Sequence, residues 1–277
     1  MTSLQALLLG MVQGLTEFLP VSSSGHLVLG KKFLGVASEM PVTFEVVVHA
    51  GTLLATLIVF WKPLWEIMGF LGRVATRRTR GRLWADPSCR LLVAIVLGTI
   101  PAGVAGVLLN DRIESLFSSI LLVAIALCAT GTLLFATHWS RSCTQGSENV
   151  SVPQALIVGV VQAIAIAPGI SRSGSTIATG LLCGIDREAA ARFSFLLSMP
   201  AISGAAVLKA RDIAQASVAV GWLPLALGFA MSFVVGLVAL WVVLTFVRQG
   251  RFHWFGYYCW VVGLAAIVAF SLGFLRG

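Results

Sequence analysis

The sequence predicts an all-α integral membrane protein with two inverted-topology repeats, about six transmembrane helices and two re-entrant helical hairpins that meet near the midplane. Of the 277 residues, 58% are hydrophobic and only 11% are charged, and the mean hydropathy is +0.95, which is typical of a bilayer protein and not of a soluble core. Two apolar segments are also interrupted by polar sequence at corresponding places in the two halves. We expect one membrane domain over residues 1–277, with repeat one at about 1–140 and repeat two at about 150–277.

The first interruption lies in residues 13–26, which read QGLTEFLPVSSSGH. A carboxylate, three serine hydroxyls and an imidazole are costly inside a membrane, so they are functional candidates by default. The irregular backbone around Pro20 and Gly25 is tolerated only where protein or a wet cavity surrounds it. Residues 4–19 and 27–36 are each too short to cross, and we expect them to form one re-entrant pair.

The second interruption repeats the first. Residues 159–162 (GVVQ) match residues 10–13 (GMVQ), and residues 171–174 (SRSG) match residues 22–25 (SSSG). Chance accounts for some matches in so glycine- and alanine-rich a chain, but the paired Ser-x-Ser-Gly tips are harder to explain that way. We expect a second re-entrant pair at residues 153–168 and 175–183, entering from the cytoplasm. Further matches join Phe193 to Phe44, Leu227 and Gly228 to Leu97 and Gly98, and Gly236 to Gly106.

The long apolar runs are expected to cross the membrane, because about 20 residues span its hydrocarbon core. They lie at residues 44–61, 91–109, 120–137, 190–208, 222–247 and 257–275.

The connections between these runs are polar. Lysine and arginine are concentrated between residues 62 and 90, which predicts a cytoplasmic loop and places both termini outside. Within this loop, residues 64–75 are expected to form an interfacial helix, with Trp61 and Trp65 at the headgroup level. Residues 110–114 are expected to form a short external turn, residues 209–221 an external loop, and residues 140–152 the connector between repeats.

The formal charge of +8 reflects loop orientation, and we expect no nucleic-acid partner because the arginines lack interleaved aromatic residues. The five cysteines are scattered without a CxxC pair and are expected to be small apolar packers. The sequence has no recognisable cleavable signal peptide. It leaves the oligomeric state open, a homodimer included.

Gln13 and Glu17 lie one helical turn apart and share a helix face. A carboxylate there can bind a divalent cation or act as a base; the alternative is a glutamate satisfied by a neighbouring helix. Ser22, Ser23, Ser24 and Gly25 precede a helical run, where backbone N–H groups can bind an anion, a hydroxyl can be a nucleophile, or a serine can simply cap the helix.

His26 can donate a proton or attack phosphorus, although a lone histidine is more often structural. Arg172 has the planar fork that suits phosphate oxygens, and its alternative is an internal pair with Glu17. Glu45 and His49 are expected to hold the residues of the site in place or to carry protons. A purely structural pair of the two is an equally open alternative. Further donors at the second tip are Ser171, Ser173, Gly174 and Thr176.

Taken together, the residues suit phosphoryl transfer on an anionic lipid. They also suit a transporter or flippase of a prenyl phosphate or another anion, which would bind or move its substrate without releasing phosphate. A purely structural scaffold is disfavoured by the set of Glu17, His26 and Arg172.

The two motifs closely resemble those of the undecaprenyl-diphosphate phosphatase (bacitracin-resistance) family. The resemblance covers residues 13–26 and PGISRSGSTI at 168–177, with shorter matches at 43–45, 115–117 and 193–197. It implies a multi-pass enzyme of the bacterial inner membrane that hydrolyses undecaprenyl diphosphate and recycles the lipid carrier of cell-wall synthesis. It also implies a divalent cation (magnesium or calcium) and a site facing the periplasmic or outer leaflet.

By motif match, the resemblance implies catalytic roles for Glu17, Ser23, His26 and Arg172. Glu17 is expected to hold the cation, alone or together with Gln13. Relatives carry either glutamate or glutamine at the position of Gln13, and many carry glutamine at that of His49. We expect the diphosphate to lie between the two tips, with either Ser23 attacking and His26 or Glu17 accepting its proton, or His26 attacking directly. The expected substrate-binding residues are Ser22, Ser24, Gly25, Ser171, Ser173, Gly174 and Thr176.

Overall fold

The structure, a computed structural model, describes residues 1–27, 42–76, 83–117, 119–140, 150–215 and 220–273. Six of the described helices are long and apolar enough to cross a bilayer, which confirms the predicted membrane class. They are α3 (Val42–Val59), α5 (Pro87–Leu108), α7 (Ile120–Ala136), α10 (Arg187–Gln215), α11 (Trp222–Arg248) and α12 (Trp254–Ser271). The shorter helices are α1 (Ser3–Phe18), α4 (Trp61–Ala75), α6 (Asn110–Leu116), α8 (Val152–Ile164), α9 (Arg172–Leu182) and the 3-10 turns η1 (Leu83–Ala85) and η2 (Thr137–Trp139).

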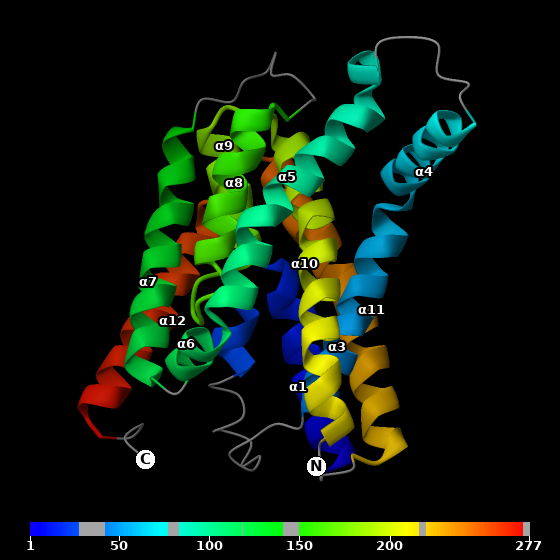
Figure 1. The fold of residues 1–277 in the computed structure, drawn as a ribbon. Helices are drawn as coiled ribbons and strands as arrows, with labels where there is room; N and C mark the ends of the chain where they lie inside the picture. Colours follow the sequence, from blue (N-terminus) through cyan, green and yellow to red (C-terminus); the bar gives the residue numbers. More distant parts are fainter. Residues whose placement is uncertain (28–41, 77–82, 118, 141–149, 216–219, 274–277) are drawn as a thin grey trace.

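Helices α1, α8 and α9, called the inner helices below, extend from opposite ends of the bundle; α9 is mostly buried, whereas α1 and α8 each have one buried and one exposed face. Figure 1 shows α1 rising from the end where both termini lie, whereas α8 and α9 lie towards the other end. These helices have 16, 13 and 11 residues. At about 1.5 Å per residue, each is shorter than a hydrocarbon core of about 30 Å. None of the three is therefore long enough to cross the hydrocarbon core alone.

Two of the inner helices begin with the same device. Thr2 caps α1 and Ser151 caps α8, and in each case a glutamine three residues later, Gln5 or Gln154, bonds back to the backbone of the capping residue. Such a capping box satisfies backbone N–H groups at the helix start. Helix α1 ends just before Pro20, which cannot continue a helix.

Glycines allow the inner helices to pack closely on two of the long ones. A methyl group placed on Gly10 of α1 would lie 2.6 Å from the carbonyl oxygen of Gly228 on α11. One placed on Gly159 of α8 would lie 2.8 Å from the Cα of Gly98 on α5. Both distances are too short for a side chain, so small residues set the spacing of these helix pairs, as is common in membranes.

Two expected connections are helical instead. Residues 110–114, expected to be a turn, belong to α6. Residues 209–215, expected to be loop, continue α10. Neither segment contains glycine or proline, so nothing in it breaks a helix once the neighbouring span is formed. The expected helix in the cytoplasmic loop is present as α4, while most of residues 27–36 and of the connector at 140–152 lies outside the described residues.

Candidate active site

The polar segments that follow α1 and α8, at residues 20–26 and 168–174 and called the two tips below, share one local geometry. Ser22 adopts a left-handed backbone with φ of 69°, and its hydroxyl accepts a hydrogen bond from the Gly25 N–H at 3.3 Å. At the second tip, Ser171 accepts one from the Gly174 N–H at 3.1 Å. Both serines therefore cap the helix that follows. For Ser22 this was one of the readings left open by the sequence, whereas Ser171 was expected only as a donor. Each also lies close to the serine two residues later: the Oγ–Oγ distance is 3.2 Å from Ser22 to Ser24 and 3.4 Å from Ser171 to Ser173.

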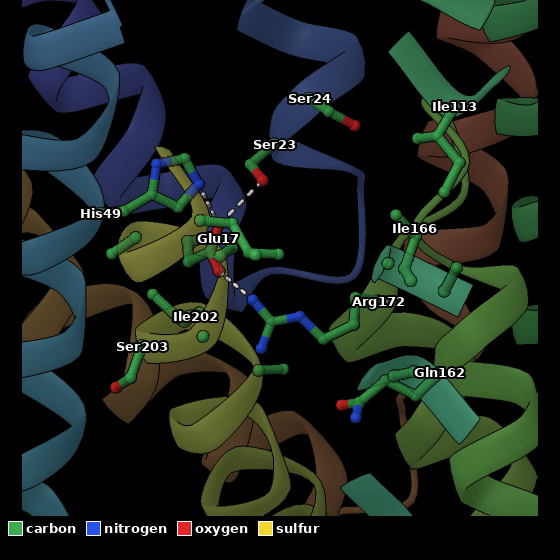
Figure 2. Close-up of a pocket in the computed structure, with 18 of the residues that line it drawn as sticks. Glu17, Ser23, Ser24, His49, Ile113, Gln162, Ile166, Arg172, Ile202 and Ser203 are labelled. Carbon is green, nitrogen blue, oxygen red and sulfur yellow. Dashed lines mark hydrogen bonds and ion pairs between the residues drawn. The ribbon is translucent and has the colours of Figure 1, made fainter. Parts of the chain in front are cut away.

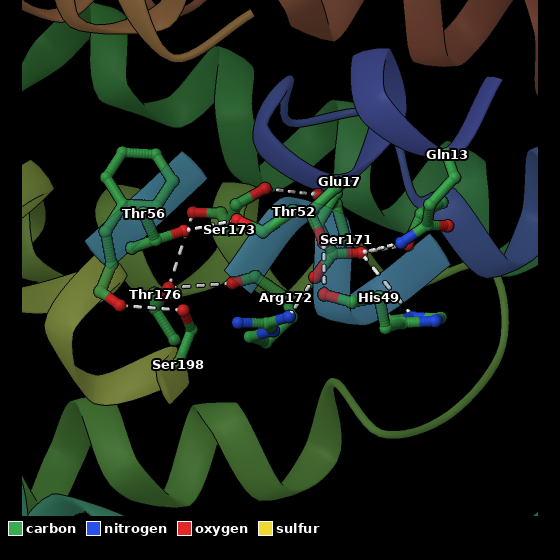
Figure 3. Close-up of polar contacts among 12 residues, drawn as sticks. Gln13, Glu17, His49, Thr52, Thr56, Ser171, Arg172, Ser173, Thr176 and Ser198 are labelled. Atoms are coloured by element: carbon green, nitrogen blue, oxygen red, sulfur yellow. Dashed lines mark hydrogen bonds and ion pairs between the residues drawn. The ribbon is translucent and has the colours of Figure 1, made fainter. Parts of the chain in front are cut away.

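Glu17 is the centre of the polar cluster between these tips. Arg172 Nη2 donates to its Oε1, while its Oε2 accepts hydrogen bonds from Ser23 Oγ at 2.8 Å and Gln13 Nε2 at 3.0 Å. His49 Nε2 lies 3.8 Å from the same Oε2 (Figures 2 and 3). The Glu17 side chain is only 3% exposed, so its charge needs this set of partners. The internal pair of Glu17 and Arg172, which the sequence left open as the alternative for Arg172, is thus present.

This cluster forms the polar end of a cavity of about 890 Å³. Figure 2 shows Ser23, Glu17, His49 and Arg172 around it. The remaining wall is mainly apolar and comes from α5, α6 and α10, with Val107, Ile113, Phe117, Ala201, Ile202 and Val207 among its residues. A cavity with a charged end and an apolar wall suits a ligand that has an anionic head and a hydrocarbon chain.

Most of the expected site residues lie on this cavity. Its lining includes Glu17, Ser22, Ser23, Ser24, Glu45, His49, Ser171, Arg172 and Ser173. Gly25, Gly174, Gln13, Thr176 and His26 are not part of the lining. Thr176 is buried, and its hydroxyl lies 2.7 Å from the Arg172 carbonyl oxygen and 2.5 Å from Ser194 Oγ, so it contacts the backbone that carries the guanidinium.

His26 is directed at α12 rather than at the Glu17 cluster. Its Nδ1 lies 2.9 Å from the Ser22 carbonyl oxygen, and its Nε2 lies 2.9 Å from the Tyr258 hydroxyl. The two rings are stacked with centroids 5.7 Å apart. The catalytic role expected for His26 therefore stays a prediction. Sequence reasoning missed Tyr258, whose signal was a phenol, one of two in the chain, inside an apolar run.

Glu45 and His49 lie beside the cluster, as expected. Glu45 also contacts a lysine of α10, which the sequence did not predict. His49 Nδ1 lies 2.8 Å from the backbone carbonyl oxygen of Glu45, and Lys209 Nζ donates to Glu45 Oε2 at 3.1 Å. Lys209 had been expected in an external loop, and it lines the cavity instead. This end of the cavity thus carries a cation in addition to Arg172.

The donors present fit a divalent cation only in part. Among the described residues, no group of three or more His, Cys, Asp and Glu side chains could hold a metal. However, Gln13 Oε1 is buried without a hydrogen-bond partner beside the Glu17 carboxylate. The Glu17 carboxylate alone matches the preference of magnesium in part, since that ion is often held by one or two carboxylates together with substrate phosphates.

Comparison with known proteins identifies the family. The sequence pattern of the family described as "Bacitracin resistance protein BacA" matches residues 6–265. The chain belongs to this family. Its relatives in the BacA family include proteins named undecaprenyl-diphosphatase from Desulforapulum autotrophicum and Halothermothrix orenii, which are 44% and 40% identical. These alignments cover 96% and 95% of this chain and 97% and 96% of the relatives.

A third relative of the same name, from Korarchaeum cryptofilum, is 41% identical over 95% of this chain and 97% of the relative. The matches therefore extend over both hairpins and all six apolar helices, and they confirm the family resemblance drawn from the two motifs.

Proposed function

We propose that this chain is a membrane phosphatase that hydrolyses undecaprenyl diphosphate to undecaprenyl phosphate and inorganic phosphate, and so recycles the lipid carrier of cell-wall synthesis. The relatives carry the name of this activity. The observation that carries the proposal is the placement of Ser23, Glu17 and Arg172 at the polar end of a cavity with an apolar wall. The diphosphate would occupy the polar end and the prenyl chain would lie along α5 and α10.

Arg172 is the proposed phosphate clamp. A guanidinium has five N–H donors, and Glu17 accepts from one nitrogen of Arg172, so the remaining donors can bind phosphate oxygens. The guanidinium would neutralise charge on the phosphoryl group as its bond to the leaving oxygen breaks. Donors that are already fixed in place lower the barrier because they need no reorganisation at that moment.

Ser23 is the proposed nucleophile. Its hydroxyl donates to Glu17 Oε2 at 2.8 Å, which is the geometry of a nucleophile beside its base. Ser23 Oγ would attack the terminal phosphorus and pass its proton to Glu17, while the bond to the bridging oxygen breaks and undecaprenyl phosphate leaves. Water would then hydrolyse the phosphoserine and release inorganic phosphate. In the competing version, His26 attacks phosphorus, and its contacts with Ser22 and Tyr258 must first break.

A divalent cation, magnesium or calcium, is proposed as the cofactor. Glu17 and the unpartnered Oε1 of Gln13 are the residues that would hold it. When bound, the ion would supply charge neutralisation for the diphosphate. The scarcity of carboxylates among the described residues supports a cation that arrives with, or is completed by, the substrate.

We further infer that the architecture consists of two inverted repeats with re-entrant hairpins. The support is that the same features recur at matched positions, namely the capping boxes of α1 and α8 and the serine caps at the two tips. The close glycine pairs are matched as well, since Gly10–Gly228 and Gly159–Gly98 exchange under the sequence repeat. The inner helices enter from opposite ends of the bundle (Figure 1).

The site is proposed to open towards the periplasmic or outer leaflet. The last turn of α4, which carries Arg73, and the first turn of α5, which carries Arg90, lie at the end opposite the N-terminus (Figure 1), and by the positive-inside rule that end is cytoplasmic. Helix α6, which lines the cavity through Ile113, lies towards the end with the termini. The cavity would therefore admit a substrate from the outer side.

The test is phosphate release from a long-chain prenyl diphosphate by the purified full chain in detergent, with and without EDTA, beside Arg172→Ala. We expect metal-dependent release that collapses in the variant. A well-folded, lipid-supplied wild type that binds the prenyl diphosphate and releases no phosphate would overturn the phosphatase and favour the transporter or flippase.

A further inference from the structure

Gln162 is a buried amide that has no role in the proposed mechanism. It lies on α8, lines the cavity and is 1% exposed. Within the part of the chain that the structure describes, neither its Oε1 nor its Nε2 has a hydrogen-bond partner. A buried amide without partners is unfavourable, and leucine or methionine would fill the same space at lower cost. Its presence is explained by a polar group that it meets in the cavity.

The matched residue of the first hairpin shows what such an amide does. Gln13 occupies the corresponding position on α1, is fully buried, and donates through Nε2 to Glu17. At the position that corresponds to Glu17, the second hairpin has Ile166, which also lines the cavity. Gln162 therefore has the same placement as Gln13 but lacks the carboxylate that would accept its hydrogen bond.

Arg172 is the charged group on the same side of the cavity. Figure 2 shows the Gln162 amide on the side of the guanidinium that is away from Glu17. Thr99, a polar residue of α5 that also lines the cavity, already donates its hydroxyl to the Ile95 carbonyl oxygen at 2.7 Å. An anion bound to the Arg172 donors that Glu17 does not use would thus find Gln162 as a further donor.

We propose that Gln162 is a substrate-binding residue, whose Nε2 donates a hydrogen bond to a phosphate oxygen of the diphosphate held by Arg172. The inference rests on the proposed function for the identity of the ligand, since the chemistry itself requires only a phosphate or diphosphate anion. The two glutamines then have complementary partners, because Gln13 donates to the carboxylate of the protein and Gln162 to the anion of the substrate.

The experiment measures binding of inorganic diphosphate to the full chain in detergent, by calorimetry and as inhibition of prenyl diphosphate hydrolysis. Gln162→Leu is expected to weaken binding about tenfold or more, as for loss of a hydrogen bond to a charged group. Gln162→Glu, of the same shape, is expected to weaken it further by repulsion. Thr245→Val is the control, because it removes a hydroxyl that is bonded to the Trp241 carbonyl oxygen within α11 and does not line the cavity, and it should leave the affinity unchanged.

Thermal unfolding of the ligand-free protein separates binding from folding. Gln162→Leu should leave the midpoint unchanged or raise it, because an unpartnered amide is replaced by an apolar group of similar size. Unchanged affinity for diphosphate in Gln162→Leu would overturn the proposal and assign the amide to internal water. If the wild type binds diphosphate but does not hydrolyse the lipid, the proposed phosphatase activity is wrong. The diphosphate affinities of the wild type, Gln162→Leu and Gln162→Glu still decide whether Gln162 binds the anion.

Discussion

The Arg172 guanidinium donates to the Glu17 carboxylate across 155 residues of sequence, so that one half of the chain holds the charged group of the other. The pair is largely buried, with side chains 22% and 3% exposed. Buried pairs of this kind add little net stability, and removal of one partner leaves an uncompensated charge. Replacement of either residue alone is therefore expected to lower stability as well as activity.

Replacement of Arg172 is predicted to abolish most of the activity. Arg172→Ala should lower phosphate release by about 100-fold or more, the usual loss when a donor to the transition state is removed. Arg172→Lys should recover only part, because a lysine cannot bind two phosphate oxygens through a planar fork. Arg248→Ala is the matched control, since Arg248 pairs with Glu188 on the surface and should leave the rate within about twofold. Equal rates for Arg172→Ala and Arg248→Ala would remove Arg172 from the site.

Ser23 and His26 are predicted to differ in the size of their effects. Ser23→Ala should lower the rate by about 1,000-fold or more, since it removes the proposed nucleophile. His26→Ala and Tyr258→Phe should have smaller and similar effects, because each breaks the same 2.9 Å contact. Acid- and base-stability of a trapped phospho-protein, followed by peptide mapping, identifies the residue. A phosphohistidine at position 26 would reverse the assignment.

The cation requirement is predicted to depend on Gln13. EDTA should stop phosphate release, and magnesium or calcium should restore it. Gln13→Leu should raise the cation concentration needed for half-maximal activity, because it removes an oxygen beside Glu17, whereas Gln13→Glu should lower it by adding charge. Titrations of each ion measure this directly, with Thr245→Val as the reference. A requirement that is identical in all three variants would place the cation elsewhere.

The glycine contacts are predicted to limit the spacing of the inner helices. Gly10→Ala and Gly159→Ala should each destabilise the protein by about 1–3 kcal/mol, the range found for overpacking. Gly72→Ala on α4, where no atom lies within 4 Å of an added methyl group, should instead stabilise it by about 0.5–1 kcal/mol. Thermal unfolding in one detergent compares the three. Similar midpoints for Gly10→Ala and Gly72→Ala would contradict the close packing of α1 on α11.

Asp86 is predicted to make the start of α5 sensitive to acid. Burial raises the pKa of this carboxyl, but hydrogen bonds from Arg73 and Ser88 outweigh it, so that the pKa lies below its ordinary value. The stabilising contribution is therefore present above the ordinary pKa of an aspartate and is lost as the pH falls through the lowered one.

The corresponding experiment is unfolding as a function of pH. At neutral pH, Asp86→Ala should cost about 1 kcal/mol through loss of the cap, and Asp86→Asn less because an asparagine still caps. The difference between wild type and Asp86→Asn should shrink towards acid pH, and a difference that does not change with pH would show that the carboxylate charge has no part in it.

The spans and the polar centre could be predicted from the sequence because both follow from local chemistry. Six apolar runs became six long apolar helices, since each must satisfy its own backbone inside a bilayer. The pairing of Glu17 with Arg172 was one of two readings of the arginine, and it agrees with the cost of burying either charge alone. The cap at Ser22 was likewise one of the readings of the first serine run, whereas the cap at Ser171 was not predicted.

What could not be predicted depends on how the helices pack. The contact of His26 with Tyr258 joins residues on different helices and has no local signal. Lys209 became a lining residue because α10 continues past the expected end of its span. Gln162 was noticed only as a repeat match, since an amide in an apolar helix does not reveal whether it finds a partner.

The two halves of the chain carry different side chains at two decisive matched positions. Glu17 and Ser23 of the first half correspond to Ile166 and Arg172 of the second. Neither half of the chain therefore contains both the nucleophile and the clamp. If the polypeptide were divided between residues 140 and 150 and the two fragments were produced together in one membrane, activity would depend on their reassembly, and each fragment alone would be inert. Such a split enzyme would report on association of the halves through phosphate release.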